Sequence, residues 1–412
     1  MNITITPGTL SGAVTPPPSK SQAHRLLLAA ALAGGESVIS NVALSQDIQA
    51  TLDCLDNLGA EFAVDGSTVT VRGMGANPMS PLRRMAYPRL DCGESGSTLR
   101  FLIPVALAVR GGGIFSGRGR LMERPQTPYF DLFDEKGIFH EQKNGVLTVT
   151  GMLTPGSYSL PGDVSSQFVT GLLYALPLLD GDSEIVLTSK LESAGYIGMT
   201  LEALKQFGVR VEARENGWSI PGGQLYRPCR RTVEADWSQA AFWFAALSLE
   251  NPVEVRAVKI PSIQGDWHWL DLHEQMCAAP RTQVDVSQNP DLVPPLAAAA
   301  ALSAGRTIRL TNAARLRMKE SDRLTSVSQV LGALGADVTE GPDFLEIRGK
   351  ERLAGGVTVD SFNDHRIAMM AAIAATRCVK PVTITGAQCV AKSYPNFWEE
   401  YERLGGALRR TP

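Results

Sequence analysis

Residues 324–349, LTSVSQVLGALGADVTEGPDFLEIRG, contain the pattern that decides the fold. Apolar residues recur at helical spacing as far as Leu334, and Gly335 then gives a helix C-cap signal. The phrase LGADV opens a short strand, and a second strand ends in LEIRG. The stretch therefore predicts an amphipathic helix followed by two strands.

The same arrangement returns along the chain. The phrases LGAEF and VTVRG follow a predicted helix at residues 48–58, and FGVRV and WSIPG follow another at residues 201–207. Before each amphipathic helix stand a short β-branched strand and a helix that is apolar nearly all round. These apolar helices are predicted at residues 21–32, 98–109, 168–179, 240–249, 292–302 and 366–376.

The unit thus occurs six times, about every 70 residues. We expect the second and fifth copies to be degenerate, the fifth having only residues 269–276 in place of the amphipathic helix and no capping glycine. A generic α/β protein with chance similarity is the alternative, but six coincidences of order argue against it.

The length of the chain sets the number of domains. Its 412 residues are 44% hydrophobic and 20% charged, which is an ordinary globular composition. One hydrophobic core stops growing below this length, so two domains of roughly 200 residues are expected. A helix that is apolar all round must be buried on every side. The predicted fold is therefore α/β, with two similar domains of three repeats around their buried helices.

Composition also limits the class of function. The longest apolar runs, residues 99–109 and 294–304, fall short of the roughly 18 residues of a membrane span, and no export signal begins the chain. The six cysteines form no C-x-x-C pair and are interpreted as reduced thiols of a cytoplasmic protein. A net charge of -3 argues against a nucleic-acid partner. We expect no membrane partner and a monomer.

Cations stand at the starts of several predicted helices, where the helix dipole disfavours them by about 0.3–1 kcal/mol. Ser, Thr, Asn and Asp at these points are ordinary caps, but the cations beside them are not explained by capping. The positive residues at helix starts are Lys20, Arg25, Arg100, Lys319, Arg323, Arg366 and Lys392.

A helix start with free N–H groups and a neighbouring cation is a phosphate or carboxylate site. Several such starts predict a strongly anionic ligand, and we expect the two domains to stay apart until anions neutralise the cations. The alternative is that each cation is a solvated helix-end residue paired with a nearby acid.

The chain resembles the 5-enolpyruvylshikimate-3-phosphate synthase family along its whole length. Nine motifs occur in the family's order, and nine together are far more specific than any one. They are PPSKSQAHR, DCGESGSTLR, MERP, SSQF, ADWSQAA, PDLVP, RMKESDR, NDHR and AKSYP.

The resemblance implies two domains, each of three β-α-β-α-β-β repeats around buried helices. One would comprise residues 18–230, and the other residues 1–17 with 231–412, with the active site in the cleft between them. The chain would cross between domains near residues 14–18 and 226–232. The implied reaction transfers the enolpyruvyl group of phosphoenolpyruvate to shikimate 3-phosphate by addition and elimination, on the pathway to chorismate and the aromatic amino acids.

The resemblance also implies a role for each matching residue. The implied shikimate 3-phosphate ligands are Lys20, Ser21, Arg25, Ser165, Ser166, Gln167, Ser193, Asp291 and Lys319, with Tyr196 nearby. The implied phosphoenolpyruvate ligands are Lys20, Gly96, Arg124, Gln167, Arg323, Arg366 and Lys392. The first group would belong mainly to the N-terminal domain, and most of the second group's arginines to the C-terminal domain.

The implied reaction needs a base for a hydroxyl and an acid for a carbon. Asp291 fits the base, Glu320 fits the proton donor, and Lys20 and Lys392 complete the implied catalytic set. A carboxyl among cations has a lowered pKa, which suits a base better than an acid, so the donor stays open between Glu320 and Lys392. No cofactor is implied, and no cluster with ligand spacing implies a metal.

Three positions depart from the family's common pattern. His24 stands where Asn is frequent, Glu94 replaces an Asn, and Arg315 occupies the place of an Asn that contacts the substrate phosphate in some relatives. Glu94 would weaken an anion site unless an arginine such as Arg100 pairs with it.

Three other functions are alternatives. A UDP-N-acetylglucosamine enolpyruvyl transferase would carry Lys-Asn where this chain has Lys20-Ser21, and a reactive Cys near the second motif. A non-catalytic phospho-metabolite-binding homologue would not need Asp291, Glu320 and Lys392. An RNA-end cyclase-like protein should be more basic.

Overall fold

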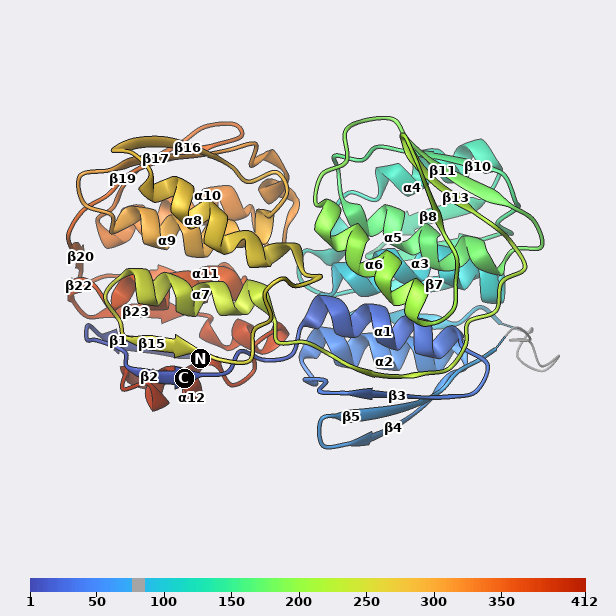
Figure 1. The fold of residues 1–412 in the computed structure, drawn as a ribbon, viewed down its shortest axis with the longest axis horizontal. Coiled ribbons are helices and arrows are strands. Elements are labelled where there is room, and N and C mark those ends of the chain that lie inside the picture. The colour runs from blue at the N-terminus through green and yellow to red at the C-terminus, as the bar shows by residue number, and fades with distance from the viewer. Residues whose placement is uncertain (76–85) are drawn as a thin grey trace. The chain divides into compact units, whose positions relative to one another are not determined.

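The computed structural model describes residues 1–75 and 86–412. The chain divides into two compact units, which we call the middle unit (Pro18–Glu234) and the terminal unit (Met1–Pro17 with Ala235–Pro412). In Figure 1 the middle unit runs from blue through green, and the terminal unit from yellow to red with the first blue strands. The boundary expected at residue 230 falls inside a strand, and the middle unit continues to Glu234.

The middle unit contains three sheets of the same design. Each has four strands, of which the first pair is parallel and the other two join antiparallel; the orders are β14-β3-β5-β4, β6-β7-β9-β8 and β10-β11-β13-β12. The first sheet comprises β3 (Glu36–Ser40), β4 (Glu61–Asp65), β5 (Thr68–Arg72) and β14 (Arg230–Thr232). The second comprises β6 (Arg89–Asp91), β7 (Gly112–Ser116), β8 (Phe139–Lys143) and β9 (Val146–Thr150). The third comprises β10 (Ser157–Leu160), β11 (Ser183–Leu187), β12 (Glu212–Arg214) and β13 (Gly217–Ile220).

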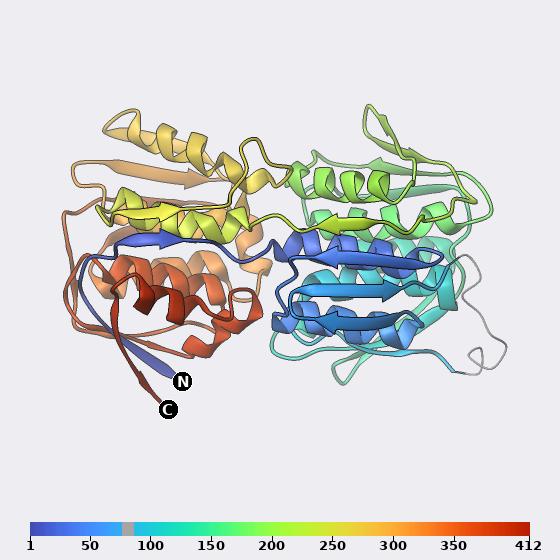
Figure 2. The same ribbon diagram turned by 60° about the horizontal axis from the view of Figure 1, so that its bottom comes forward.

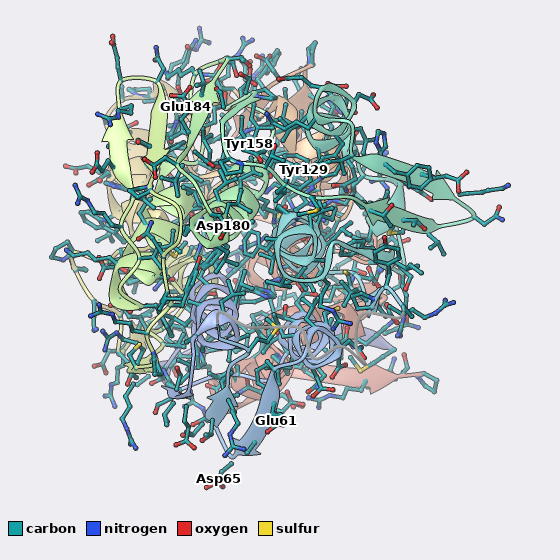
Figure 3. All side chains as sticks on the ribbon, turned by 90° about the vertical axis from the view of Figure 1, so that its right-hand side faces the viewer. Glu61, Asp65, Tyr129, Tyr158, Asp180 and Glu184 are labelled. Atoms are coloured by element: carbon teal, nitrogen blue, oxygen red, sulfur yellow. The ribbon has the colours of Figure 1, made fainter. Side chains whose placement is uncertain are left out.

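Two kinds of helix connect these strands. The apolar ones are α1 (Lys20–Leu32), α3 (Gly96–Arg110) and α5 (Ser166–Ala175), and the amphipathic ones are α2 (Gln46–Leu58), α4 (Thr127–Lys136) and α6 (Ala194–Gln206). Figure 2 shows the first sheet lying across α1 and α2. Viewed end-on, Tyr129 and Tyr158 lie inside the unit, whereas Asp65 lies at the outer end of β4 (Figure 3).

The terminal unit has one complete repeat formed in sequence order. Its sheet, β16-β17-β19-β18, comprises β16 (Arg281–Asp285), β17 (Thr307–Thr311), β18 (Asp337–Glu340) and β19 (Leu345–Arg348). The last sheet, β21-β23-β1-β24, borrows the N-terminal strand of the chain and comprises β1 (Asn2–Thr6), β21 (Thr358–Asp360), β23 (Val382–Thr385) and β24 (Ala407–Thr411). Two smaller pairs join β2 (Gly12–Val14) to β15 (Val253–Val255), and β20 (Leu353–Gly355) to β22 (Cys378–Lys380).

Buried helices form the core of this unit. Every residue of α9 (Val293–Ala301) and of α11 (His365–Ala375) is buried, and both helices pack against α7 (Trp237–Ser248). The amphipathic helices are α8 (Trp269–Cys277), α10 (Arg323–Leu334) and α12 (Phe397–Arg403). The apolar and amphipathic helices thus divide between core and surface, as their patterns predict.

The expectation about degenerate copies was wrong. The second copy is complete, because α4 ends at Gly137 in the left-handed conformation and two antiparallel strands follow. The incomplete copy is the fourth, which contains α8 and only the strand pair β15-β2. The sequence-based count missed α4 and assigned residues 269–276 to the wrong copy.

Within the described ranges, no helix has both the length and the apolar character needed to cross a membrane. The six cysteines are free thiols. Residues 1–75 and 86–412 contain no group of three or more His, Cys, Asp or Glu side chains that could hold a metal ion.

Candidate active site

In the middle unit the first buried helix begins with a lysine beside an acid. Ser19 caps α1, its hydroxyl accepting from the backbone N–H of Gln22 at 3.4 Å. Lys20 is the first helical residue, and its Nζ lies 2.6 Å from Oδ2 of Asp47 in the first turn of α2. The carboxylate compensates a cation that the dipole of α1 disfavours.

Arg25 lies one turn further along α1 and is only 2% exposed. Its Nε donates to the Thr200 hydroxyl at 2.9 Å, and its Nη1 donates to the Ser21 carbonyl at 2.8 Å. The guanidinium lies over the rings of Phe101 and Tyr196, at 5.2 and 5.9 Å from their centres. Burial lowers the pKa of Arg25 to about 10, since its partners in these bonds are neutral.

Gln167 is held by both ends of its side-chain amide. Its Oε1 accepts from Nη1 of Arg100 at 2.9 Å, and its Nε2 donates to the Ser97 hydroxyl at 3.0 Å. Arg100 is 4% exposed and also donates to the Pro125 carbonyl and the Gln126 amide. The start of α5 is therefore tied to the start of α3.

Gly96 is the first residue of α3 and faces an arginine. A Cβ at this position would lie 2.5 Å from Nη1 of Arg124, so any side chain would displace the guanidinium. Arg124 is 7% exposed and follows the short turn η2 (Leu121–Glu123). Only glycine permits this close approach of backbone and cation.

The predicted serines occupy two helix starts. Ser165 caps α5 by accepting from the Gln167 N–H at 3.3 Å, and Ser166 follows as the first helical residue. Ser193 precedes α6 in the left-handed conformation, with φ at 57°, and is 2% exposed. Tyr196, three residues after Ser193 at the start of α6, supplies a ring beside Arg25.

A chain of buried hydrogen-bonding side chains links α1, α2 and α3. The Thr51 hydroxyl lies 2.8 Å from Nδ1 of His24 and 2.6 Å from the Thr98 hydroxyl, which donates to the Ser95 hydroxyl at 2.7 Å. Burial, and then the charges of Lys20 and Arg25, hold the pKa of His24 well below its usual value. The histidine that departs from the family pattern is therefore a neutral hydrogen-bonding group.

In the terminal unit the centre of the site is Asp291, on the short turn η5 (Pro290–Leu292) before α9. Its Oδ1 lies 2.9 Å from Nη1 of Arg323 and 3.4 Å from Nζ of Lys319, and its Oδ2 lies 3.0 Å from Nη2 of Arg366. Burial acts to raise the pKa of Asp291, but Arg366, Lys319 and Arg323 outweigh it and hold the pKa well below its usual value. The side chain remains 18% exposed.

Arg323 is surrounded by carboxylates. Besides Asp291 it contacts Glu320 through Nη2, and Asp364 through Nε at 2.9 Å and Nη2 at 3.3 Å. Burial acts to lower its pKa, but Asp364, Glu320 and Asp291 together raise it above the ordinary value. The Arg323 side chain is only 1% exposed.

Two further cations complete the group. Burial lowers the pKa of Lys319, with Asp291 acting in the opposite direction. Lys392, 3% exposed at the end of η7 (Ala387–Lys392), donates to the Asn363 carbonyl at 2.6 Å. Arg366 also donates to the Ser238 hydroxyl at 3.0 Å, and that hydroxyl donates to Asp236 at 2.7 Å.

The structure thus gathers the predicted residues of each unit. The middle unit holds Lys20, Ser21, Arg25, Gly96, Arg124, Ser165, Ser166, Gln167 and Ser193 at helix starts or against them. The terminal unit holds Asp291, Lys319, Glu320, Arg323 and Arg366 in one network of ion pairs. Arg315, which departs from the family pattern, donates to the Ser287 carbonyl.

Sequence reasoning missed several residues of these networks. Arg100 is predicted as a cation at a helix start and as a partner for Glu94, but its hydrogen bond to Gln167 is not predicted. Asp236, Ser238 and Asp364 stand inside the motifs ADWSQAA and NDHR, but their roles depend on contacts with distant segments. The motifs could have indicated that these residues matter, but no sequence signal indicates which distant residues they contact.

The fold, built from repeats around buried helices, is that of the enolpyruvyl transferases. The solved structure of the enolpyruvyl transferase NikO from Streptomyces tendae matches it with a TM-score of 0.77 over 100% of this chain and 98% of that one. At 19% identity this likeness shows the fold alone.

The chain belongs to the EPSP synthase family. The family model described as EPSP synthase (3-phosphoshikimate 1-carboxyvinyltransferase) matches residues 5–401. A 3-phosphoshikimate 1-carboxyvinyltransferase of Clostridium acetobutylicum is 44% identical over 98% of this chain and 97% of its own length. That of Clostridium beijerinckii is 42% identical over 99% and 98%. The solved EPSP synthase of Acinetobacter baumannii is 26% identical, with a TM-score of 0.80 over 100% of both chains.

Proposed function

We propose that this chain is a 3-phosphoshikimate 1-carboxyvinyltransferase, which transfers the enolpyruvyl group of phosphoenolpyruvate to shikimate 3-phosphate and releases phosphate. Membership of the family supports this reaction. The observation that carries the proposal is Asp291, a carboxylate held among Arg323, Arg366 and Lys319. Such a group combines a base with cations suited to phosphate and carboxylate oxygens.

The reaction has two halves. In the first, the shikimate hydroxyl gives its proton to Asp291 while its oxygen forms a bond to C2 of phosphoenolpyruvate. C3 takes a proton and becomes a methyl group. In the second, the methyl group returns one proton, the C2–O bond to phosphate breaks, and inorganic phosphate leaves as the double bond forms again.

We assign the phosphoenolpyruvate anions to Arg323, Arg366 and Lys392, together with Lys20, Gly96, Arg124 and Gln167. Planar guanidinium groups pair with carboxylate and phosphate through two parallel hydrogen bonds. In the free protein, Arg323 and Arg366 bind Asp291 instead. When these arginines turn to substrate oxygens, Asp291 loses the charges that hold its pKa down, and it becomes a stronger base.

We assign shikimate 3-phosphate to groups that are mostly neutral. Ser165, Ser166, Gln167 and Ser193 stand at helix starts, which favour phosphate. Lys20, Ser21 and Arg25 of α1, with Lys319 and Asp291 of the terminal unit, complete this set. The middle unit thus supplies most of the shikimate 3-phosphate ligands, and the terminal unit supplies the base and most cations for phosphoenolpyruvate.

The proton for C3 comes from Glu320 or Lys392 in this proposal. Glu320 is paired with Arg323, an arrangement that favours its ionised form, so it must be reprotonated or freed before it donates. Lys392 is buried, and its Nζ donates to the Asn363 carbonyl at 2.6 Å. Separate Glu320→Gln and Lys392→Met variants distinguish the two, because loss of the donor slows solvent deuterium incorporation at C3.

The test of the proposal is phosphate release from phosphoenolpyruvate. We expect release with shikimate 3-phosphate and none without it, and mass spectrometry should find the enolpyruvyl ether. Release with UDP-N-acetylglucosamine instead would make the chain the sister transferase. No release with either acceptor, despite tight substrate binding, would indicate a non-catalytic homologue.

We further propose that the protein works as a monomer in the cytoplasm. Its six free thiols fit a reducing compartment. Sedimentation velocity at several protein concentrations tests the oligomeric state, and fractionation of cells tests the compartment.

A further inference from the structure

The turn that leads from β21 to α11 has an unusual backbone. Phe362 and Asn363 both have φ at 52°, the left-handed region that residues other than glycine seldom adopt. Phe362 packs against the core of the terminal unit, and its N–H donates to Asp360 at 2.8 Å. Strained conformations of this kind persist only where the surroundings impose them, and they concentrate at functional sites.

This turn holds two hydrogen-bond acceptors against the cations Lys392 and Arg323. The Asn363 carbonyl accepts from Nζ of Lys392 at 2.6 Å. Asp364 follows and binds Nε and Nη2 of Arg323 at 2.9 and 3.3 Å. A carbonyl and a carboxylate in consecutive residues thus hold side chains from two distant segments.

The same carboxylate begins the helix that carries the third cation. Oδ1 of Asp364 accepts from the backbone N–H of Arg366 at 3.0 Å and caps α11. Ser321, beside Glu320 and two residues before Arg323, donates to Oδ2 at 3.1 Å. Asp364 is 0% exposed, so it acts on a ligand only through the groups that it holds.

Arg323 divides its guanidinium between two kinds of partner. The Nε side is held by the buried Asp364, whereas Nη1 meets Asp291, which is partly exposed. A ligand anion can therefore replace Asp291 while Asp364 keeps the guanidinium in place. A planar group anchored on one side loses little freedom when it binds on the other.

We infer that the turn of residues 361–364 is the positioning element that sets Arg323, Arg366 and Lys392 in one arrangement for an anionic ligand. This inference rests on the proposed function for the identity of that ligand, which is phosphoenolpyruvate. The backbone carbonyl of Asn363 supplies the contact to Lys392. Asp364 and Asn363 are positioning residues, since neither is assigned a contact with substrate.

The test compares substitutions that differ in their tolerance of the left-handed backbone. Asn363→Gly keeps both the conformation and the carbonyl, whereas Asn363→Val opposes the conformation. Asn144→Val is a matched control, because Asn144 also has φ at 52° and lies exposed between β8 and β9 of the middle unit. Both valine variants should lower the melting temperature similarly.

We expect Asn363→Val to raise KM for phosphoenolpyruvate by about 30-fold or more, as misplacing a buried charged pair does. KM for shikimate 3-phosphate should stay within about twofold, and Asn363→Gly and Asn144→Val should stay within about twofold for both substrates. Equal KM values for phosphoenolpyruvate in Asn363→Val and Asn144→Val would overturn the inference.

Asp364→Asn provides a second measurement if Asn363→Val does not fold. It should likewise raise KM for phosphoenolpyruvate selectively, and an unchanged KM would contradict the inference. Calorimetric titration of phosphoenolpyruvate into the shikimate 3-phosphate complex must rank the variants in the same order. A wild-type protein without turnover would overturn the proposed function, while this ranking would still decide the role of the turn.

Discussion

Arg25 of the middle unit and Arg323 of the terminal unit are compensated in opposite ways. In the middle unit, Arg25 and Arg100 donate to hydroxyl, amide and carbonyl groups. In the terminal unit, Arg323 and Arg366 donate to carboxylates. The pKa of Arg25 is lowered to about 10 by burial, whereas the carboxylates around Arg323 raise its pKa.

The difference shows what a ligand must do in each unit. An anion that reaches Arg25 adds a negative charge to a buried cation that has only neutral partners in these bonds. An anion that reaches Arg323 must replace an existing carboxylate. Two unit charges 4 Å apart interact by about 4 kcal/mol at an effective dielectric near 20, so both effects are large. Lys20, paired with Asp47, is an exception in the middle unit.

Replacing Asp291 by Asn should give the largest effect on turnover. Loss of a general base lowers kcat by about 10²–10⁴. Phosphoenolpyruvate should bind at least as tightly as before, because Arg323 and Arg366 no longer have to release a carboxylate. Rapid-quench kinetics measures turnover, and calorimetry measures affinity.

The control for this variant is Asp337→Asn, which removes a 47% exposed carboxylate of the same unit. It should leave both kcat and affinity unchanged. If Asp291→Asn weakened phosphoenolpyruvate binding tenfold or more, the proposal that Arg323 and Arg366 leave Asp291 to bind the substrate would be wrong.

The two arginines should respond oppositely to Met substitution. Arg323→Met leaves Asp364 buried without its charged partner, and the loss of stability should be about 3–5 kcal/mol. Arg25→Met removes a buried cation whose neutral partners can bond elsewhere, so the melting temperature should stay the same or rise. Differential scanning calorimetry of the ligand-free variants gives both values.

Measuring ligand affinity in these two Met variants distinguishes an effect on binding from an effect on stability. Arg25→Met should weaken shikimate 3-phosphate binding by about 2–5 kcal/mol although the fold is no less stable. A melting temperature that falls equally in both variants would remove the contrast between the units.

The pH dependence should sharpen the comparison further. In the free protein the pKa of Asp291 is well below its ordinary value of about 3.9, so protonation of the base should limit kcat/KM only below that pH. In the substrate complex the arginines turn away, so the acid limb of kcat should lie at a higher pH. The pH profiles of kcat/KM and kcat, corrected for titration of the substrate phosphates, measure both acid limbs. Acid limbs at the same pH would contradict the proposal that the arginines leave Asp291 when substrate binds.

The same carboxylate affects stability in acid. Since the folded-state pKa is depressed, the contribution of Asp291 is present above its unfolded pKa and is lost as the pH falls through the folded value. Asp291→Asn should therefore flatten the acid limb of stability below about pH 4. Urea unfolding at several pH values measures it.

Local signals explain how much of this arrangement the sequence could predict. The buried helices were predictable because α9 and α11 are apolar on every side, and Gly335 ends α10 in the left-handed conformation. The cations at helix starts could be singled out as candidate anion ligands, because the helix dipole disfavours a positive charge there. These features depend on neighbours within a few residues.

The partners of the cations depend on distant residues. Arg323 and Asp364 are separated by 41 positions, and Arg100 and Gln167 by 67. Neither periodicity nor capping specifies such pairs. The strained turn at Phe362 and Asn363 was hidden for the same reason, because only the surrounding fold imposes it.

The smallest expected effect concerns His24, which keeps a further charge out of the middle unit. Because its pKa in the folded state is well below 6.5, the unfolded chain binds more protons below that pH. Stability from this group is complete above pH 6.5 and falls toward lower pH by at most about 1.4 kcal/mol per unit. His24→Asn should therefore lose less stability than the wild type between pH 7 and 5, with kcat at pH 7 unchanged. Equal losses would mean that His24 is already charged beside Lys20 and Arg25, and that the middle unit tolerates more positive charge than the contrast with the terminal unit allows.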